Sequence, residues 1–180
     1  MIGATGPNSQ ETFDKQKKIL KHMLRSYDVS PDRTHVGIIS SGNPAKIDVK
    51  LGQVKDQKAL YSQIDQISLQ KSDRDGVLAA LNIAYNDMFT KVNGARLGFK
   101  KSLVVFVNDK LDADEDALKA VGEKLKESGV NVIVVGLSGK VDERQTKLIA
   151  PLYDVFFFPP QLDELDMSVY PITQAVYPGE

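Results

Sequence analysis

Apolar residues recur along this chain with two periods, one typical of helices and one typical of buried strands. Stripes at helical spacing, such as Leu118, Val121 and Leu125, predict helices over residues 11–27, 56–67, 77–92, 113–128 and 141–149. Apolar runs and alternation predict strands over residues 35–40, 45–51, 103–107, 130–136 and 154–158. Residues 161–176 are expected to be partly helical, with a break at Pro171.

The order of these elements favours an α/β fold. Strands that alternate with helices predict a doubly wound, mostly parallel central sheet with helices on both faces. Residues 41–44 read as a hairpin connection, which adds one antiparallel edge strand. We expect a single domain over residues 1–180. Because the chain begins almost inside its first strand, we interpret it as a piece of a longer multidomain protein.

Several side-chain roles follow from the spacing. In the strand over residues 45–51, Ile47 and Val49 are expected to share a face. The acidic residues near 112–116 are expected to cap a helix, since Asp112 and Glu115 have the spacing of a capping box. The lysines of residues 15–18 are expected to form a solvated face. The helix over residues 77–92 is expected to bury Leu78, Leu81, Ala84, Tyr85 and Met88.

Composition excludes several classes of protein. The chain has 180 residues, a net charge of -1 and a pI near 6.1, so it lacks the basic character of nucleic-acid binding proteins. No apolar run approaches the roughly 20 residues of a membrane span. The absence of cysteine excludes a disulfide-built scaffold.

Catalytic motifs are also missing from the sequence. There is no Ser nucleophile elbow, no P-loop and no paired His motif for zinc, so we do not expect an enzyme. A nucleotide-binding enzyme on a doubly wound sheet is a weaker alternative. It would need a phosphate-binding loop near residues 3–7, where glycines are present but lysine is not, and where Pro7 lacks an N–H.

Four short motifs occur in a fixed order. They are Ser-Pro-Asp-Arg-Thr-His-Val-Gly at residues 30–37, Gly-Ala-Arg at 94–96, Gly-Val-Asn-Val-Ile-Val-Val-Gly at 129–136 and Leu-Ile-Ala at 148–150. Their order and spacing resemble the von Willebrand factor A domain family over essentially the whole chain. The resemblance implies a non-catalytic adhesion module, secreted into the extracellular matrix. In two features the chain resembles the tandem A domains of type VI collagen chains: it has no cysteine, and it lacks most of the family's metal ligands, whose positions are given next.

The resemblance also locates the family's metal-ion-dependent adhesion site. Its five ligand positions fall on Gly3, Thr5, Pro7, Asp73 and Asp109. Gly3 and Pro7 supply no side-chain oxygen, and Asp73 replaces a threonine. Since Mg²⁺ requires oxygen ligands in near-octahedral geometry, we expect a vestigial site and no metal cofactor. The alternative is a weak or rearranged Mg²⁺ or Ca²⁺ site on Thr5, Asp73 and Asp109.

The loops at residues 3–8, 70–76 and 108–112 are then expected to bind an extracellular matrix protein, either collagen or a neighbouring A domain. Recognition would use shape and hydrogen bonds without a bridging metal. The alternative is a structural spacer in a tandem A-domain array, with no ligand of its own. Neither nucleic-acid binding nor membrane insertion is expected.

Overall fold

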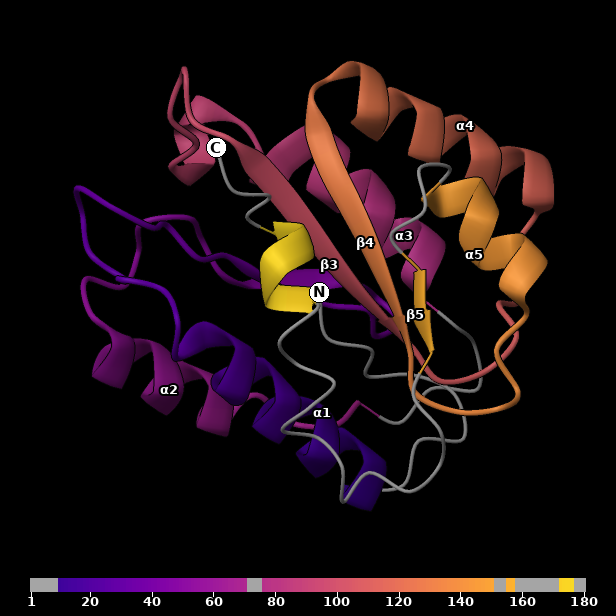
Figure 1. Cartoon of the computed structure of the whole chain (residues 1–180), viewed down its shortest axis with the longest axis horizontal. Coiled ribbons are helices and arrows are strands. Elements are labelled where there is room, and N and C mark those ends of the chain that lie inside the picture. Colours follow the sequence, from indigo (N-terminus) through magenta and orange to yellow (C-terminus); the bar gives the residue numbers. More distant parts are fainter. Residues whose placement is uncertain (1–9, 71–75, 151–154, 158–171, 177–180) are drawn as a thin grey trace.

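Helices cover the strands from two sides in the computed structural model, which describes residues 10–70, 76–150, 155–157 and 172–176. Figure 1 shows α1 and α2 together on one side of the strands and α3, α4 and α5 on the other. The helices are α1 (Gln10–Leu24), α2 (Gln57–Gln66), α3 (Val77–Ile83), α4 (Glu115–Glu127) and α5 (Glu143–Ile149). The strands are β1 (Ile38–Ser40), β2 (Lys46–Val49), β3 (Lys101–Val107), β4 (Val130–Gly136) and β5 (Val155–Phe157). A π-helical turn (Ala84–Met88) and a 3-10 turn (Lys91–Asn93) follow α3, and residues 172–176 form a further helical turn.

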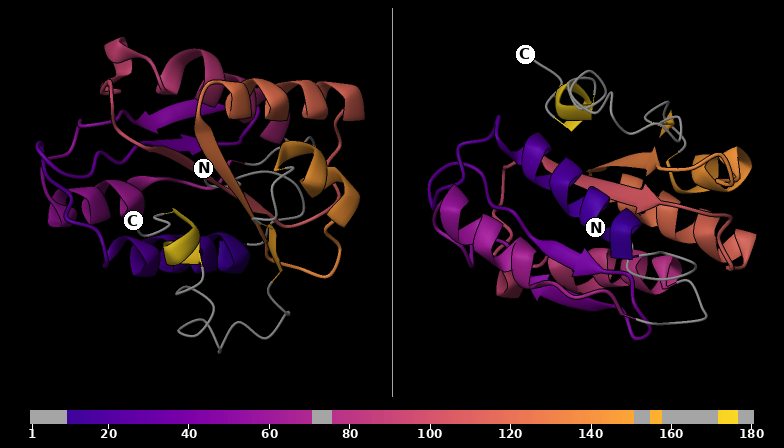
Figure 2. Two further views of the ribbon diagram at one scale, coloured as in Figure 1. Left: turned by 45° about the horizontal axis from the view of Figure 1, so that its top comes forward. Right: turned by 90° about the horizontal axis from the view of Figure 1, so that it is seen from below.

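The predicted α/β fold is confirmed. Strands β3, β4 and β5 pair in parallel and in that order, while β1 and β2 form the predicted antiparallel hairpin. Figure 2 shows the strands between the helices from two further directions. Strand β4 has the predicted bounds, and Gly129 ends α4 with a φ of 73°. A further strand, expected at the very start of the chain before residues 35–40, lies outside the described residues.

Two buried clusters show that both groups of strands belong to one layer. Ile38 of β1 and Phe106 of β3 pack with α1 and α2, while Ile39 and Val105 pack with α3, α4 and α5. Successive residues of a strand point to opposite faces. Both cores therefore receive side chains from β1, β2, β3 and β4, which explains why β3 and β4 are almost continuously apolar.

The expectation that Ile47 and Val49 share a face is wrong. Ile39 lies opposite Ile47, but Ile38 lies opposite Val49, so Asp48 is an extra residue in the ladder. Such a bulge reverses the alternation beyond it. Val49 joins the core under α1 and α2, whereas Ile47 packs against the other core.

The helix over residues 77–92 also departs from its predicted stripe. Leu81, Ala84 and Met88 are buried as expected, and Leu78 is half-buried. Tyr85 is 37% exposed, and its ring lies beneath Nζ of Lys124 at 6.0 Å. The prediction for Tyr85 is therefore wrong, because Ala84 takes the central position and the helix changes to a π turn there.

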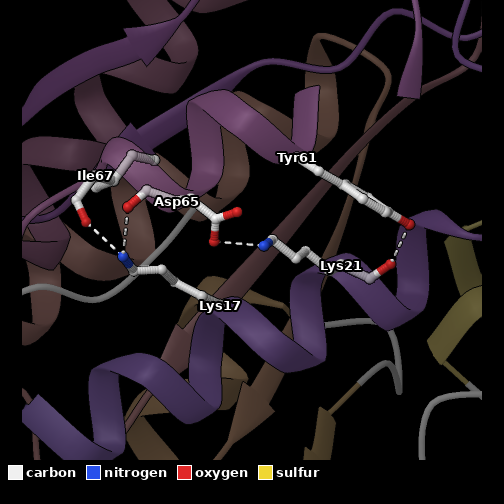
Figure 3. Close-up of polar contacts among 5 residues, drawn as sticks. All are labelled: Lys17, Lys21, Tyr61, Asp65 and Ile67. Atoms are coloured by element: carbon white, nitrogen blue, oxygen red, sulfur yellow. Dashed lines mark hydrogen bonds and ion pairs between the residues drawn. The ribbon is translucent and has the colours of Figure 1, made fainter. Parts of the chain in front are cut away.

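Lysines of α1 hold α2 in place, as Figure 3 shows. Lys17 donates to the carbonyl oxygens of Ile67 at 2.7 Å and Asp65 at 3.2 Å, which lie at the C-terminal end of α2. Lys21 pairs with the Asp65 carboxylate, and the Tyr61 hydroxyl donates to the carbonyl of Lys21 at 2.8 Å. A cation at the C-terminal end of a helix satisfies carbonyls that have no intrahelical donor.

These contacts change the interpretation of residues 15–18. Lys17 caps a neighbouring helix instead of facing solvent, and Gln16 between the two lysines is fully buried. The prediction of a solvated face holds for Lys18, which is exposed. The ammonium group of Lys17 thus stabilises the C-terminal end of α2.

Candidate functional site

Asp109 is the one predicted adhesion-site residue that lies within the described part of the chain. It follows the end of β3, and its Oδ1 accepts a hydrogen bond from the backbone N–H of Lys110 at 2.8 Å. Asp109 is half-buried and Lys110 is exposed. The other four positions, Gly3, Thr5, Pro7 and Asp73, lie outside the described residues.

The loop that carries Asp109 is fastened to the neighbouring strand and helix. Ser138, just after β4, donates through Oγ to the carbonyl of Asn108. Gln145 of α5 is 3% exposed, and its side-chain amide bonds both backbone groups of Leu111, at 2.9 Å and 3.1 Å. Leu111 is itself 4% exposed. Because buried backbone groups need partners, this pair of hydrogen bonds fixes the path of the loop beyond Asp109.

Sequence reasoning missed Gln145. It lies in a short helix among charged residues, and no spacing rule separates it from an exposed glutamine. Its partner is 34 positions away in the chain, so only the packing of α5 against the loop reveals the contact.

An acidic residue caps the N-terminus of α4, as expected, but the capping residue is Asp114 and not Asp112. Asp114 is the N-cap, and its Oδ1 accepts from the N–H of Ala117 at 2.8 Å. The predicted capping box from Asp112 is therefore wrong, because the helix begins at Glu115 and puts Asp112 two residues before the cap. Glu115 pairs with Arg144 of α5. This ion pair joins α4 to α5, in addition to the hydrogen bonds that join α5 to the loop.

A close backbone contact joins the end of β1 to the start of α3. A Cβ atom on Gly76 would overlap the carbonyl oxygens of Ser41 and Gly42. A side chain at position 76 would thus push α3 away from the end of β1. The absence of a side chain there is a packing requirement that lets α3 begin against the end of β1.

A separate polar cavity of about 220 Å³ lies between β2 and α2. Lys46 and Asp48 line it from β2, and Lys46 Nζ lies 3.2 Å from Asp48 Oδ1. Glutamines 63, 66 and 70 complete most of its polar wall. Asp109, the described adhesion-site position, is not among the residues that line this cavity.

The fold defines the class of protein as an α/β domain. Its candidate ligand-binding loop follows the carboxyl end of β3, and ligands of open α/β sheets usually bind at the carboxyl ends of strands. The family model for the von Willebrand factor type A domain matches residues 4–169, so the chain belongs to this family.

Relatives with curated names include matrix proteins. Chicken (Gallus gallus) matrilin-1 is 24% identical over 150 residues, which cover 82% of this chain and 29% of the relative. The human collagen alpha-5(VI) chain is 28% identical over 139 residues, covering 76% of this chain and 5% of the relative. The chain thus spans less than a third of the length of these relatives.

A solved structure shares the fold. Proximal thread matrix protein 1 of the mussel byssus superposes with a TM-score of 0.84 at 16% identity, covering 93% of this chain and 43% of that one. One structure of that mussel protein has zinc in its MIDAS motif, the metal-ion-dependent adhesion site.

Proposed function

We propose that this chain is a non-catalytic protein-binding module of an extracellular matrix protein and that it binds its partner without a bridging metal. Membership of the von Willebrand factor A family and similarity to matrilin-1 and type VI collagen chains support the adhesive role and the extracellular placement. Among the described helices, none combines the length and apolar character that a membrane span needs.

The proposal that binding is independent of metal rests on the residues at the family's five metal-ligand positions. Of the five family positions, Gly3 and Pro7 have no side-chain oxygen, and Asp73 stands where the family has threonine. Asp109 is retained, but one of its oxygens accepts the N–H of Lys110, whose side chain brings a positive charge beside it. Mg²⁺ tolerates few departures from an oxygen octahedron, so these residues do not fit the ion.

Protein recognition then depends on the loop surface. The loop at residues 108–112 is fixed by Ser138 and Gln145, and a fixed loop loses little conformational entropy when it binds. We propose collagen or a neighbouring A domain as the partner of this edge.

A solid-phase binding assay with the whole chain tests the proposal. Fibrillar collagen and a purified matrilin-1 A domain serve as probes, each measured with EDTA and with Mg²⁺. We expect the apparent Kd for the bound probe to agree within about twofold in the two conditions, a difference of less than about 0.5 kcal/mol. Binding that EDTA abolishes and Mg²⁺ restores would overturn metal independence. Absence of binding to every probe would favour the spacer role instead.

A variant with restored ligands gives the matched comparison. Gly3→Asp, Pro7→Ser and Asp73→Thr together reintroduce the family's oxygens. Calorimetric titration with Mg²⁺ should give heat of binding for this variant and none for the unmodified chain. A saturable Mg²⁺ isotherm for the unmodified chain would show that Thr5, Asp73 and Asp109 hold an ion after all.

A further inference from the structure

A basic loop with exposed apolar side chains leads into β3. Residues 91–101 contain no acidic residue, although the whole chain has a net charge of -1. Within this segment Val92 is 88% exposed, Leu97 94% and Phe99 52%, three of the four exposed large apolar residues of the described chain. Single exposed apolar residues are ordinary, but a group on one loop indicates an interaction surface. The basic residues of the segment are Lys91, Arg96, Lys100 and Lys101.

Contacts with a neighbouring turn hold this loop in a defined shape. The Arg96 guanidinium donates to the carbonyl of Pro31 at 3.1 Å and lies 3.8 Å from the centroid of the Phe99 ring. Nδ1 of His35 lies 3.1 Å from the carbonyl oxygen of Gly94. Gly94 has a φ of 88°, a conformation that other residues rarely adopt. The apolar side chains are therefore presented by an ordered backbone, which lowers the entropic cost of docking.

The opposite end of β3 carries the opposite charge. Residues 109–116 contain five acidic residues against one lysine, a net charge of -4 that matches the four basic residues of the loop. Asp112 and Asp116 are exposed and form no ion pair with any residue of the described ranges. Asp114 caps α4 and Glu115 pairs with Arg144. Asp112 and Asp116 therefore remain for basic side chains of another molecule.

We propose that the basic loop of one copy of this chain docks on the acidic segment of a second copy, head to tail along the direction of β3. Figure 1 shows the two segments, residues 91–101 and 109–116, at opposite ends of that strand. Because the two surfaces differ and lie at opposite ends, the contact leaves one of each free and can repeat. Opposite charges bring the copies together and set their orientation, while Val92 and Leu97 lose exposed apolar area.

This inference rests on the proposed function, because it uses the same edge and makes a second copy of this chain its A-domain partner. A single contact of this size is weak, and it would strengthen where domains are linked in one chain or held at high local concentration. Self-association and collagen binding are measured separately, so either can fail while the other holds.

Sedimentation velocity on the whole chain tests the contact. At low ionic strength and concentrations up to about 1 mM, the unmodified chain should show a weight-average mass that rises with concentration. Raising NaCl to about 0.5 M should suppress the rise, because the Debye length then falls to roughly 4 Å. A chain that stays monomeric throughout at low salt would overturn the proposal.

Two complementary variants make the test specific for a head-to-tail contact. The loop variant is Lys91→Glu with Leu97→Glu, and the acidic-segment variant is Asp112→Lys with Asp116→Lys. Each alone should stay monomeric, because each lacks one half of the contact. An equimolar mixture should form heterodimers, since the acidic segment of the first and the loop of the second are unchanged. A mixture that remains monomeric would contradict the inference.

Matched charge changes elsewhere serve as controls. Lys58→Glu with Lys140→Gln makes the net charge more negative by three, as Lys91→Glu with Leu97→Glu does, at exposed positions outside both surfaces. This control should self-associate like the unmodified chain, and thermal melts should confirm that all variants fold. Self-association of the acidic-segment variant at the unmodified level would show a loop-to-loop contact and overturn the head-to-tail arrangement.

Discussion

Gln145 and Leu111 form a two-point hydrogen bond between a buried side-chain amide and a buried backbone. Gln145 Oε1 accepts from the N–H of Leu111 at 2.9 Å, and Nε2 donates to the Leu111 carbonyl at 3.1 Å. The contact joins α5 to the loop that follows Asp109. It satisfies both polar groups of a residue that has almost no contact with water.

Replacing Gln145 should destabilise the fold and loosen this loop. Gln145→Met keeps the volume but leaves the Leu111 N–H and carbonyl without partners, at a cost of about 1–3 kcal/mol. Denaturant unfolding should show the loss, and hydrogen exchange should accelerate at the Leu111 amide. Gln66→Met, at an exposed position of α2, is the control and should change stability by less than about 0.5 kcal/mol. Equal stability of the two variants would contradict the role of Gln145.

Replacing Gln16 should stabilise the fold, in contrast to replacing Gln145. Its side chain is fully buried in α1, and neither its Oε1 nor its Nε2 has a hydrogen-bond partner among the described residues. Gln16→Met removes two buried polar groups at similar volume and should stabilise the fold by about 1 kcal/mol. For a chain of this length that corresponds to an increase in Tm of about 2–4 °C. Lys18→Met on the exposed side of α1 controls for helix propensity, and a lower Tm for Gln16→Met would refute the prediction.

A side chain at Gly76 should not be tolerated. Gly76→Ala would place a methyl group against the carbonyl oxygens of Ser41 and Gly42, which are backbone atoms and cannot rotate away. We expect a loss of about 1–3 kcal/mol in the free energy of unfolding, as for other overpacked sites. Gly139→Ala is the control, because a Cβ there meets nothing within 4 Å. Similar urea midpoints for both variants would show that the strand end can move.

Stability at alkaline pH should depend on Tyr27. Burial raises the pKa of Tyr27 to about 12, and its hydroxyl donates to the carbonyl of Thr173 at 3.1 Å. Since the folded pKa lies above the unfolded value of about 10, the contribution is complete below pH 10 and is lost as the pH rises towards 12. Urea unfolding at pH 9 and pH 11.5 should show a larger loss for the unmodified chain than for Tyr27→Phe. Tyr85→Phe, on an exposed ring, should behave like the unmodified chain.

The sequence alone determined the elements and their order. Continuous apolar runs identified β3 and β4 as strands covered on both faces, because a strand between two helical layers has no polar side to display. Gly129 marked the end of α4, where a left-handed residue is required. Motif order was enough for the family, since each motif lies at a fixed place in this fold.

Tertiary structure decided where the periodic patterns break and which polar side chains are used inside the fold. The extra residue at Asp48 turned Val49 to the other core, and the π turn after α3 left Tyr85 exposed. Gln16, Lys17 and Gln145 are of residue types that usually lie on the surface. Lys17 and Gln145 nevertheless donate to distant backbone carbonyls, and Gln16 is fully buried. Periodicity reports only neighbours along the chain. The partners of these side chains arrive from other helices and loops, so their roles exist only once the layers have packed.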